Sequence, residues 1–267
     1  MHPARNWKPY VVIVGAALVF GLRVALQPAG VPFPPGSDYS DIVLAHWPNA
    51  EFVRRSLVAY GQLPLWNPNV LGGQPFAADP LAGISYPPDW LLFFLPLPLG
   101  FNLLYLAHLV WAGWGALRWL RAEGRSEAAA LFGALLVMGL PKAAAHYGAG
   151  HFGLVQAVAW TPWLLLAVRR TDDTRTALRL GAVAALVFLA DVRWCAYAGA
   201  LTGAYWLVRV QRFERRALRL AAVAVGGFVA FGAVLWLPLA EFVRLSSRTS
   251  LTLDEASIFA LGLRDLA

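Results

Sequence analysis

The sequence has few charged residues and a single cysteine. Of its 267 residues, 14% are charged and 59% are hydrophobic. Soluble domains use roughly 25% charged and 45–50% apolar residues, so this composition excludes an ordinary soluble domain. One cysteine excludes a disulfide framework, and Cys195 lies inside an apolar run, where it is expected to be a small core residue. The composition indicates an integral membrane protein.

The motifs of several enzyme classes are also missing. The sequence contains no G-x-x-x-x-G-K-[ST] phosphate loop, no H-E-x-x-H zinc pair, no cysteine cluster and no G-x-S-x-G elbow. The stretch "GAGHFG" at 148–153 lies between two apolar runs, not between the strand and helix that a dinucleotide fingerprint requires. These absences exclude nucleotide binding, zinc proteolysis and serine hydrolysis by the familiar motifs.

Several apolar runs are long enough to cross a membrane. A spanning helix needs roughly 17–25 mostly apolar residues. The seven candidates are 9–27, 99–119, 127–146, 151–168, 176–192, 193–210 and 217–239. Prolines divide the run at 87–98 into pieces too short to span, which predicts an interfacial or re-entrant segment. The predicted fold is an all-α integral membrane protein with about seven transmembrane helices, in one domain over 1–267.

Lys and Arg residues alternate along the chain in a way that predicts topology. They are abundant before the first run and in the connections around 118–125, 169–179 and 209–219, and scarcer in the intervening loops. Basic residues accumulate on the cytoplasmic side. We therefore expect a cytoplasmic amino terminus and a large extracytoplasmic loop over 28–88, which in a bacterial cell would lie outside the inner (plasma) membrane. Topology also accounts for the net charge of +7, so no nucleic-acid partner is expected.

The first apolar run has a second interpretation. Arg5 and Lys8 precede it, as basic residues precede a cleaved signal peptide. The run is long for such a peptide, and "VALQPAG" is a poor cleavage site. An uncleaved helix is the favoured reading, and both readings place 28–88 outside.

The loop at 28–88 opens with a concentration of polar residues. The stretch "PGSDYSDIVLAHWP" places Asp38 and Asp41 three positions apart, with His46 close behind. The next stretch, "PNAEFVRRSLVAYG", predicts a short surface helix that begins near Pro48 and stops at Gly61. Its two arginines, Arg54 and Arg55, would face water or lipid phosphates. Four aromatic residues of this region suit the headgroup layer: Trp47, Trp66, Tyr86 and Trp90.

Three motifs carry a family resemblance. They are "DIVLAHWP" with the run G-x-L-P-L-W-N-P … G-G-x-P-F … D-P … Y-P from Gly61 to Pro87, then "GHFGLVQAVAWTPWLLLA", then "LPLAEFVRLSSRTSL". Together they resemble the bacterial YfhO-like polytopic membrane proteins, which are grouped with the GT-C glycosyltransferases. The resemblance covers essentially the whole chain but only the amino-terminal part of such proteins. It implies a fragment of a longer protein in which 240–267 opens a further extracytoplasmic loop.

The resemblance also implies an activity. It implies a sugar transferase whose donor is a polyprenyl-phosphate-linked sugar, taken from the membrane lipids on the outer face and passed to a cell-envelope acceptor. Asp41 best matches the catalytic carboxylate of the superfamily, and Asp38 is the second choice. Because D-x-x-D departs from the closely spaced acidic pair usual there, metal binding by Asp38 and Asp41, and hence a divalent cation cofactor, stays open.

The chemistry of sugar transfer leads to the same residues. Transfer needs a base for the acceptor hydroxyl and a cation for the leaving phosphate. Asp41 would supply the base, and His46, Arg54 or Arg55 would hold phosphate. In the alternative reading, Asp38 caps a helix with Asp41 at the third position, as in a capping box.

Further ionisable residues fall at the outer ends of the predicted spans. Lys142, His146 and His151 flank one outside turn, and Asp191 with Arg193 flanks the next. Ionisable groups at membrane depth are costly and are functional candidates by default; alternatively, the last two pair locally and the histidines anchor the interface. Within the second span, His108 and Asn102 are expected to hydrogen bond between helices. The substrate-binding candidates are His46, Arg54, Arg55, Trp66, Asn67, His151, Asp191 and Arg193.

Two functions of different classes fit these features. One is the lipid-carrier-dependent glycosyltransferase, and the other is a transporter or flippase for lipid-linked sugars or other amphipaths. A transporter places its binding residues near the membrane midplane and often has internal repeats. Here the ionisable residues gather at one interface and no repeat is evident, which favours the enzyme.

Overall fold

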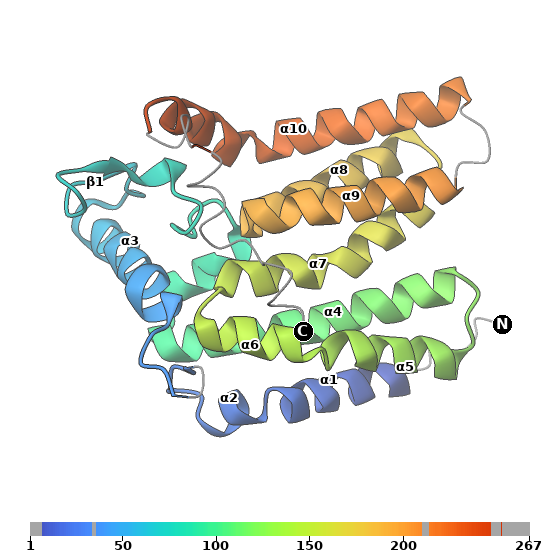
Figure 1. The fold of residues 1–267 in the computed structure, drawn as a ribbon, viewed down its shortest axis with the longest axis horizontal. Coiled ribbons are helices and arrows are strands. Elements are labelled where there is room, and N and C mark those ends of the chain that lie inside the picture. The colour runs from blue at the N-terminus through green and yellow to red at the C-terminus, as the bar shows by residue number, and fades with distance from the viewer. Residues whose placement is uncertain (1–6, 34–35, 210–213, 247–251, 253–267) are drawn as a thin grey trace.

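A computed structural model describes residues 7–33, 36–209, 214–246 and 252. The described chain is mostly helical, and most of its longer helices lie side by side along one direction (Figure 1). The α-helices are α1 (Lys8–Phe20), α2 (Leu22–Leu26), α3 (Trp47–Tyr60), α4 (Leu97–Ala122), α5 (Glu127–Met138), α6 (Pro141–Ala149), α7 (Phe152–Arg169), α8 (Thr174–Ala190), α9 (Val192–Arg209) and α10 (Arg215–Arg244).

The segment between α2 and α4 contains shorter elements. A π-helical turn, Ile42–His46, leads directly into α3, and 3-10 turns cover Phe76–Ala78 and Pro87–Phe93. Strands β1 (Trp66–Asn67) and β2 (Gln74–Pro75) pair antiparallel, with Trp66 opposite Pro75. This hairpin is the one departure from helix and turn in the described chain.

Three stretches of described helix are long and apolar enough to cross a membrane: Glu127–Ala149, Phe152–Arg169 and Arg215–Arg244. This result supports the predicted class of helical membrane protein. All seven predicted runs fold as helix, but the number of spans stays a prediction because α1 has only 13 residues before the chain bends at Gly21.

Prolines interrupt the predicted helices where the backbone lacks a hydrogen-bond donor. The run predicted at 127–146 divides into α5 and α6 at Leu140, because Pro141 begins the second piece and cannot donate to the first. The proline-rich segment at 87–98 forms the short 3-10 turn and the start of α4, as the prediction of a non-spanning segment requires.

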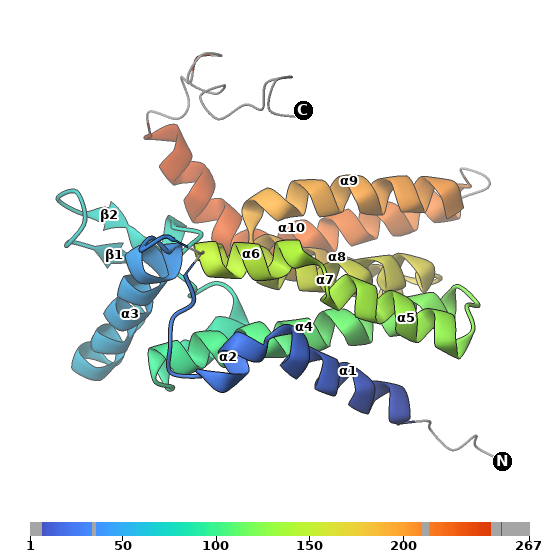
Figure 2. The same cartoon turned by 60° about the horizontal axis from the view of Figure 1, so that its bottom comes forward.

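The helix predicted between Pro48 and Gly61 is confirmed, whereas its place at the membrane surface stays a prediction. It corresponds to α3, with Pro48 in its first turn and Gly61 as a left-handed cap at φ 64°. Together with the hairpin, α3 lies across one end of the helical bundle (Figures 1 and 2). The turns α6–α7 and α8–α9 lie at this same end, and the connections α4–α5 and α7–α8 lie at the opposite end, where α9 ends and α10 begins.

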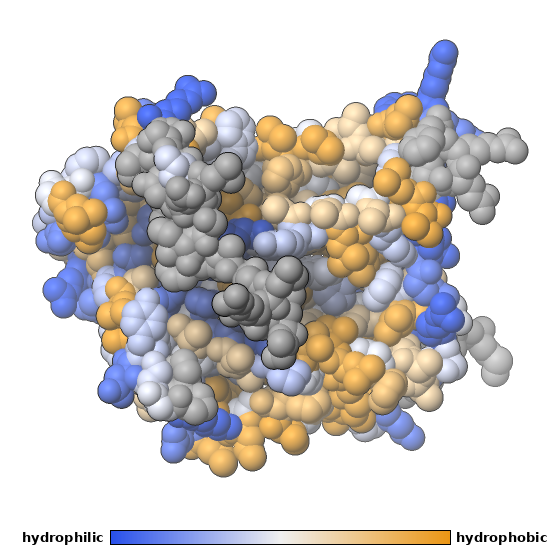
Figure 3. Space-filling model, in the orientation of Figure 1, coloured by the Kyte–Doolittle hydropathy of each residue, from blue (hydrophilic) through white to orange (hydrophobic). Residues whose placement is uncertain are grey.

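Large hydrophobic side chains are exposed along the sides of the bundle. On α1 and α10 they include Val12, Leu18, Val229, Phe231 and Leu237, each at least 43% exposed. Hydrophilic side chains gather toward the two ends (Figure 3). A soluble monomer rarely exposes so much apolar surface, so these faces fit a lipid environment.

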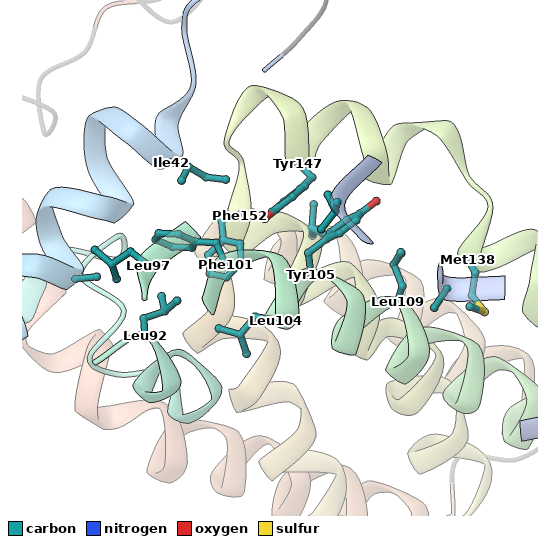
Figure 4. Packing of buried hydrophobic residues seen from close by; sticks show 14 of the residues in the cluster. Ile42, Leu92, Leu97, Phe101, Leu104, Tyr105, Leu109, Met138, Tyr147 and Phe152 are labelled. Carbon is teal, nitrogen blue, oxygen red and sulfur yellow. The ribbon is translucent and has the colours of Figure 1, made fainter. Parts of the chain in front are cut away.

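The core closest to α3 is aromatic. Ile42, Phe101, Tyr147 and Phe152 are at most 2% exposed and come from the loop, α4, α6 and α7 (Figure 4). Phe101 and Phe152 meet edge to face at 5.1 Å between ring centroids. This packing fixes the π-helical turn that follows Asp41 against the bundle.

Two details differ from the sequence predictions. Tyr86 is 1% exposed, so it is a core residue and not a headgroup anchor; its hydroxyl oxygen lies 2.7 Å from His108 Nε2 and accepts from Trp160 Nε1. The last helix continues to Arg244, past the predicted loop boundary at 240. The rest of the predicted loop at 240–267, including most of "SSRTSL", lies outside the described residues apart from 245–246 and 252.

Candidate functional site

Asp41 lies where the large loop meets the turn between α6 and α7. Its Oδ1 accepts a hydrogen bond of 2.8 Å from the Tyr39 hydroxyl, and its Oδ2 is 3.7 Å from His151 Nε2. The carboxylate raises the pKa of Tyr39 through this hydrogen bond. The Asp41 side chain is 31% exposed, so a substrate can still reach it.

Gly150 brings the α6–α7 turn against Asp41. Its φ of +88° is a left-handed conformation that caps α6. A Cβ at this position would overlap the backbone nitrogens of Asp41 and Ile42. Glycine therefore permits both the turn and the close approach that places His151 beside Asp41.

His146 and His151 face each other across the same turn. Their Nδ1 atoms are 2.8 Å apart, so one imidazole donates and the other accepts. If Nε2 of His151 carries its proton toward Asp41, Nδ1 of His151 accepts from His146. At 3.7 Å the contact with Asp41 is too long for a hydrogen bond but suits an ion pair when His151 is protonated.

His46 lies beside these residues but is buried. It is 9% exposed, and its ring packs edge to face on Phe152 with centroids 5.6 Å apart. Burial lowers the pKa of His46 to about 4, and the charges of Asp41, Asp191 and Arg193 also act on it. The imidazole is therefore neutral near pH 7, so any contact of His46 with phosphate would be a hydrogen bond from a neutral ring and not an ion pair.

Asp191 and Arg193 complete the cluster from the α8–α9 turn. Asp191 accepts from Arg193 Nη2 at 2.8 Å and from the backbone nitrogen of Trp194 at 2.8 Å. This is the local pairing that the sequence left open as an alternative. The Arg193 side chain is 63% exposed, and the charge of Asp41 acts on it. We call these six residues the Asp41 cluster: Asp41, His46, His146, His151, Asp191 and Arg193.

The remaining charged candidates lie elsewhere. Asp38 is exposed, and no side-chain hydrogen bond or ion pair is found for it within the described ranges, so the predicted helix cap is wrong. Arg54 and Arg55 both pair with Glu51 on α3, at 3.9 and 2.9 Å. Neither arginine contacts Asp41 by a hydrogen bond or ion pair in the described part of the chain.

A metal site does not emerge from these residues. In the described part of the chain, no group of three or more His, Cys, Asp or Glu side chains is arranged to hold a metal ion. Asp38 is not drawn into the cluster, so the predicted pairing of Asp38 with Asp41 at a metal lacks its second carboxylate.

Trp66 and Asn67 lie in a separate groove. It has a volume of about 1020 Å³ and runs between α3 and the segment 62–70, and we call it the α3 groove. Arg55 also lines it, whereas Asn67 is 4% exposed and holds the turn through bonds to Asn69. The structure thus divides the predicted substrate-binding residues between the Asp41 cluster and the α3 groove.

An apolar cavity of about 420 Å³ lies between α7, α8, α9 and α10. Along α9 it is lined from Cys195 to Trp206, which is on the order of 16 Å at about 1.5 Å per residue. The end of the cavity at Cys195 lies two positions along the chain from Arg193 of the Asp41 cluster. Gly199 and Gly203 leave it open because they carry no side chain.

Sequence reasoning missed Asp89. This residue lies in the 3-10 turn Pro87–Phe93, is 6% exposed and accepts a hydrogen bond from Gln156 on α7. Burial raises the pKa of Asp89 to about 7. Its signal was a lone carboxylate between two prolines and an apolar run, the pattern that marked Asp191 as a candidate.

The predicted hydrogen bond between helices is confirmed for Asn102 of α4, whereas His108 bonds within its own helix and to Tyr86 of the large loop. Asn102 accepts from the Tyr147 hydroxyl on α6 and donates to the carbonyls of Pro28 and Gly30. His108 Nδ1 lies 2.7 Å from the Leu104 carbonyl within its own helix. These bonds tie the large loop to the bundle and so position the cluster.

Comparisons with protein-family models, with curated proteins and with solved structures find no match to this chain. The resemblance to YfhO-like proteins therefore depends on the sequence motifs alone.

Proposed function

We propose that this chain is part of a membrane glycosyltransferase of the YfhO-like family. It transfers a sugar from a polyprenyl-phosphate donor to a cell-envelope acceptor on the extracytoplasmic face of the plasma membrane, with the amino terminus in the cytoplasm. The observation that carries the proposal is the Asp41 cluster, in which a carboxylate, three imidazoles and an ion pair converge from three separate outer turns.

In the proposed reaction Asp41 is the general base. Its carboxylate accepts the proton of the acceptor hydroxyl while the hydroxyl oxygen attacks the anomeric carbon of the donor sugar. The bond between that carbon and the phosphate oxygen breaks, and polyprenyl phosphate leaves with the electron pair. Tyr39 and His151 orient the base, since they approach its two oxygens from different sides.

Arg193 is the group suited to the leaving phosphate. Its side chain is 63% exposed, and its pairing with Asp191 uses Nε and Nη2, so Nη1 keeps donors for phosphate oxygens. The apolar cavity that begins at Cys195 fits the carrier's hydrocarbon tail, because its lining is almost entirely apolar. A cation beside an apolar cavity matches an amphipathic donor with an anionic head.

The placement of the ionisable groups separates this proposal from a transporter. A transporter would concentrate its binding residues near the middle of the bundle. The Asp41 cluster instead lies at the end that carries α3 and the hairpin (Figure 1). The single end favours chemistry at an interface over passage through the membrane.

The decisive experiment measures sugar transfer. Labelled sugar on a polyprenyl-phosphate donor is added to membranes containing the full-length protein, its Asp41→Asn variant or its Asp38→Asn variant. We expect transfer with the native protein and with Asp38→Asn, and none with Asp41→Asn at equal expression. Full transfer with Asp41→Asn would refute the catalytic assignment. Movement of a fluorescent lipid-linked sugar across proteoliposomes without transfer would favour the transporter.

A further inference from the structure

The α3 groove is a large concave surface separate from the Asp41 cluster. Its volume of about 1020 Å³ is at the upper end of the roughly 300–1,000 Å³ of ordinary ligand pockets. One wall is α3 with the preceding turn, and the other is the segment 62–70, which includes β1. The groove therefore has room for an extended ligand.

The lining combines aromatic faces with neutral hydrogen-bonding groups. Its aromatic residues are Trp47, Phe52, Tyr60 and Trp66. Of its four amides, Asn49 is bonded to Asp79 and Leu81 and Asn67 is bonded to Asn69, whereas Gln62 and Asn69 are exposed to a ligand. A sugar ring has an apolar face of C–H groups that packs on an aromatic ring, and a rim of hydroxyls that amides can bind as both donors and acceptors. This combination matches a saccharide.

Trp66 is fixed in place before any ligand arrives. Its backbone pairs with Pro75 across the hairpin, and a Cβ at Gly73 would lie 2.6 Å from the indole ring. One side of the ring therefore packs closely on Gly73, whereas the residue as a whole stays 55% exposed. A rigid exposed indole binds with little loss of conformational entropy.

The charges of the groove argue against an ionic ligand. Glu51 and Arg55 both line it and neutralise each other in an ion pair of 2.9 Å. No other charged side chain is among the lining residues, so the groove carries no net charge that would attract a polyanion. A hydrocarbon chain would fit the apolar cavity beside α9 better than a wall that contains four amides. The remaining fit is a neutral saccharide.

The groove also leads toward Asp41. Leu44 and Trp47 line it, and both belong to the π-helical turn and helix that follow Asp41 directly. The opposite face of this short segment carries His46, which packs on Phe152. An extended ligand bound in the groove therefore needs to pass only the segment 42–47 to reach the carboxylate of Asp41.

We propose that the α3 groove binds a neutral oligosaccharide, which presents its terminal hydroxyl to Asp41 as the acceptor. The acceptor role depends on the proposed glycosyltransferase function, whereas saccharide binding by the groove does not. The acceptor would then be a growing glycan of the cell envelope and not a single sugar or a protein side chain.

The test measures binding without transfer. The purified full-length protein in nanodiscs is titrated with maltotetraose, mannotetraose and chitotetraose, and with glucose and a neutral Gly-Ser peptide as comparisons. Binding is followed by calorimetry. We expect at least one tetrasaccharide to bind at least 10-fold more tightly than glucose or the peptide. Failure of all three tetrasaccharides to bind, or tighter binding of the peptide, would overturn the proposal.

Two variants locate the site. Trp66→Leu and Tyr60→Leu should each weaken tetrasaccharide binding 10-fold or more; Tyr60 is 75% exposed, so its replacement does not endanger the fold. Trp90→Leu is the matched control, because Trp90 is 47% exposed but lies outside the groove. Equal binding by both groove variants would refute the site. Binding with no transfer would refute the glycosyltransferase alone, and transfer with no binding would refute the groove alone.

Discussion

The two ends of the helical bundle both concentrate charged side chains but use them differently. At the α4–α5 end, Glu123 pairs with Arg169 and Arg209 at 3.3 and 3.1 Å, and Glu127 pairs with Arg121. At the α3 end, the Asp41 cluster brings two facing imidazoles, a partly exposed carboxylate and an exposed guanidinium together. Ion pairs between helix ends hold those helix ends together. Neighbouring ionisable groups between which a proton can move are the arrangement that general acid–base chemistry uses.

The largest expected effect would test whether the α3 end is the reactive one. Replacing Asp41 with Asn removes the base but keeps the size of the side chain, so transfer should fall by about 10²–10⁴-fold. Asp38→Asn is the matched control and should leave transfer within about twofold of the native rate, because Asp38 is exposed and outside the cluster. The readout is the initial rate of labelled-sugar transfer at equal expression.

A second change would break the geometry of the α3 end without touching its chemistry. Gly150→Ala places a methyl group on the backbone of Asp41 and strains a left-handed residue, which should lower stability by about 2–4 kcal/mol. Gly199→Ala is the control, since nothing lies within 4 Å of the added methyl and alanine favours the helix. Thermal unfolding in detergent measures both. Equal stability of the two variants would contradict the close packing of the turn.

The α3 end should also carry two opposing pH dependences. His46 has a pKa of about 4 in the folded protein against 6.5 normally. Its contribution to the free energy of unfolding is therefore present above pH 6.5 and is lost as pH falls through 4. Asp89 has a pKa of about 7 against 3.8, so its contribution is present below pH 3.8 and is lost as pH rises through 7. Each contribution changes the free energy of unfolding by on the order of 3 kcal/mol, and in the native protein the two opposite pH dependences largely cancel.

Single variants would separate these two dependences. Between pH 4 and 6.5, Asp89→Asn should become more stable as pH rises relative to the native protein, and His46→Gln should become less stable. Denaturation midpoints measured at several pH values, each compared with the native protein, test this. Parallel curves for all three proteins would show that these burial effects are absent.

The smallest expected effect on stability comes from replacing an arginine at the α4–α5 end, and it is compared with the replacement of Arg193 at the α3 end. Arg209→Gln removes a partly exposed partner of Glu123 and should cost less than about 1 kcal/mol, with transfer unchanged. Arg193→Gln should reduce transfer because the leaving phosphate loses its cation. Transfer rates and unfolding midpoints of the two variants give the comparison. A loss of transfer with Arg209→Gln alone would move the reactive site to the opposite end.

Several features of the α3 end could be predicted from local sequence. Pro48 and Gly61 marked the limits of α3, because proline suits a first helical turn and glycine a left-handed cap. The ionisable residues of the two outer turns were singled out because charge is costly beside apolar runs. The contact between Asp41 and His151 follows from no local pattern, since 110 positions separate them in the chain.

Other assignments failed because burial is a tertiary property. His46 and Tyr86 looked like interfacial polar residues, but packing against Phe152 and a hydrogen bond with Trp160 place them in the interior. Arg54 and Arg55 were predicted to hold phosphate; the structure pairs both with Glu51, which lies one helical turn before them, and their contact with phosphate stays a prediction.

The sequence by itself indicated that this protein lies in a lipid environment and predicted the helices that it forms. Its apolar runs require helices that satisfy their own backbone hydrogen bonds, and its prolines and glycines divide them. Only the tertiary structure decided which polar side chains meet. Helix packing brought the stretch around Asp41 and the α6–α7 and α8–α9 turns together, left Asp38 exposed, and made α3 and the segment 62–70 the two walls of a groove. The physical reason is that periodicity specifies which face of a helix is apolar, whereas the contacts between distant segments depend on how all those faces pack together.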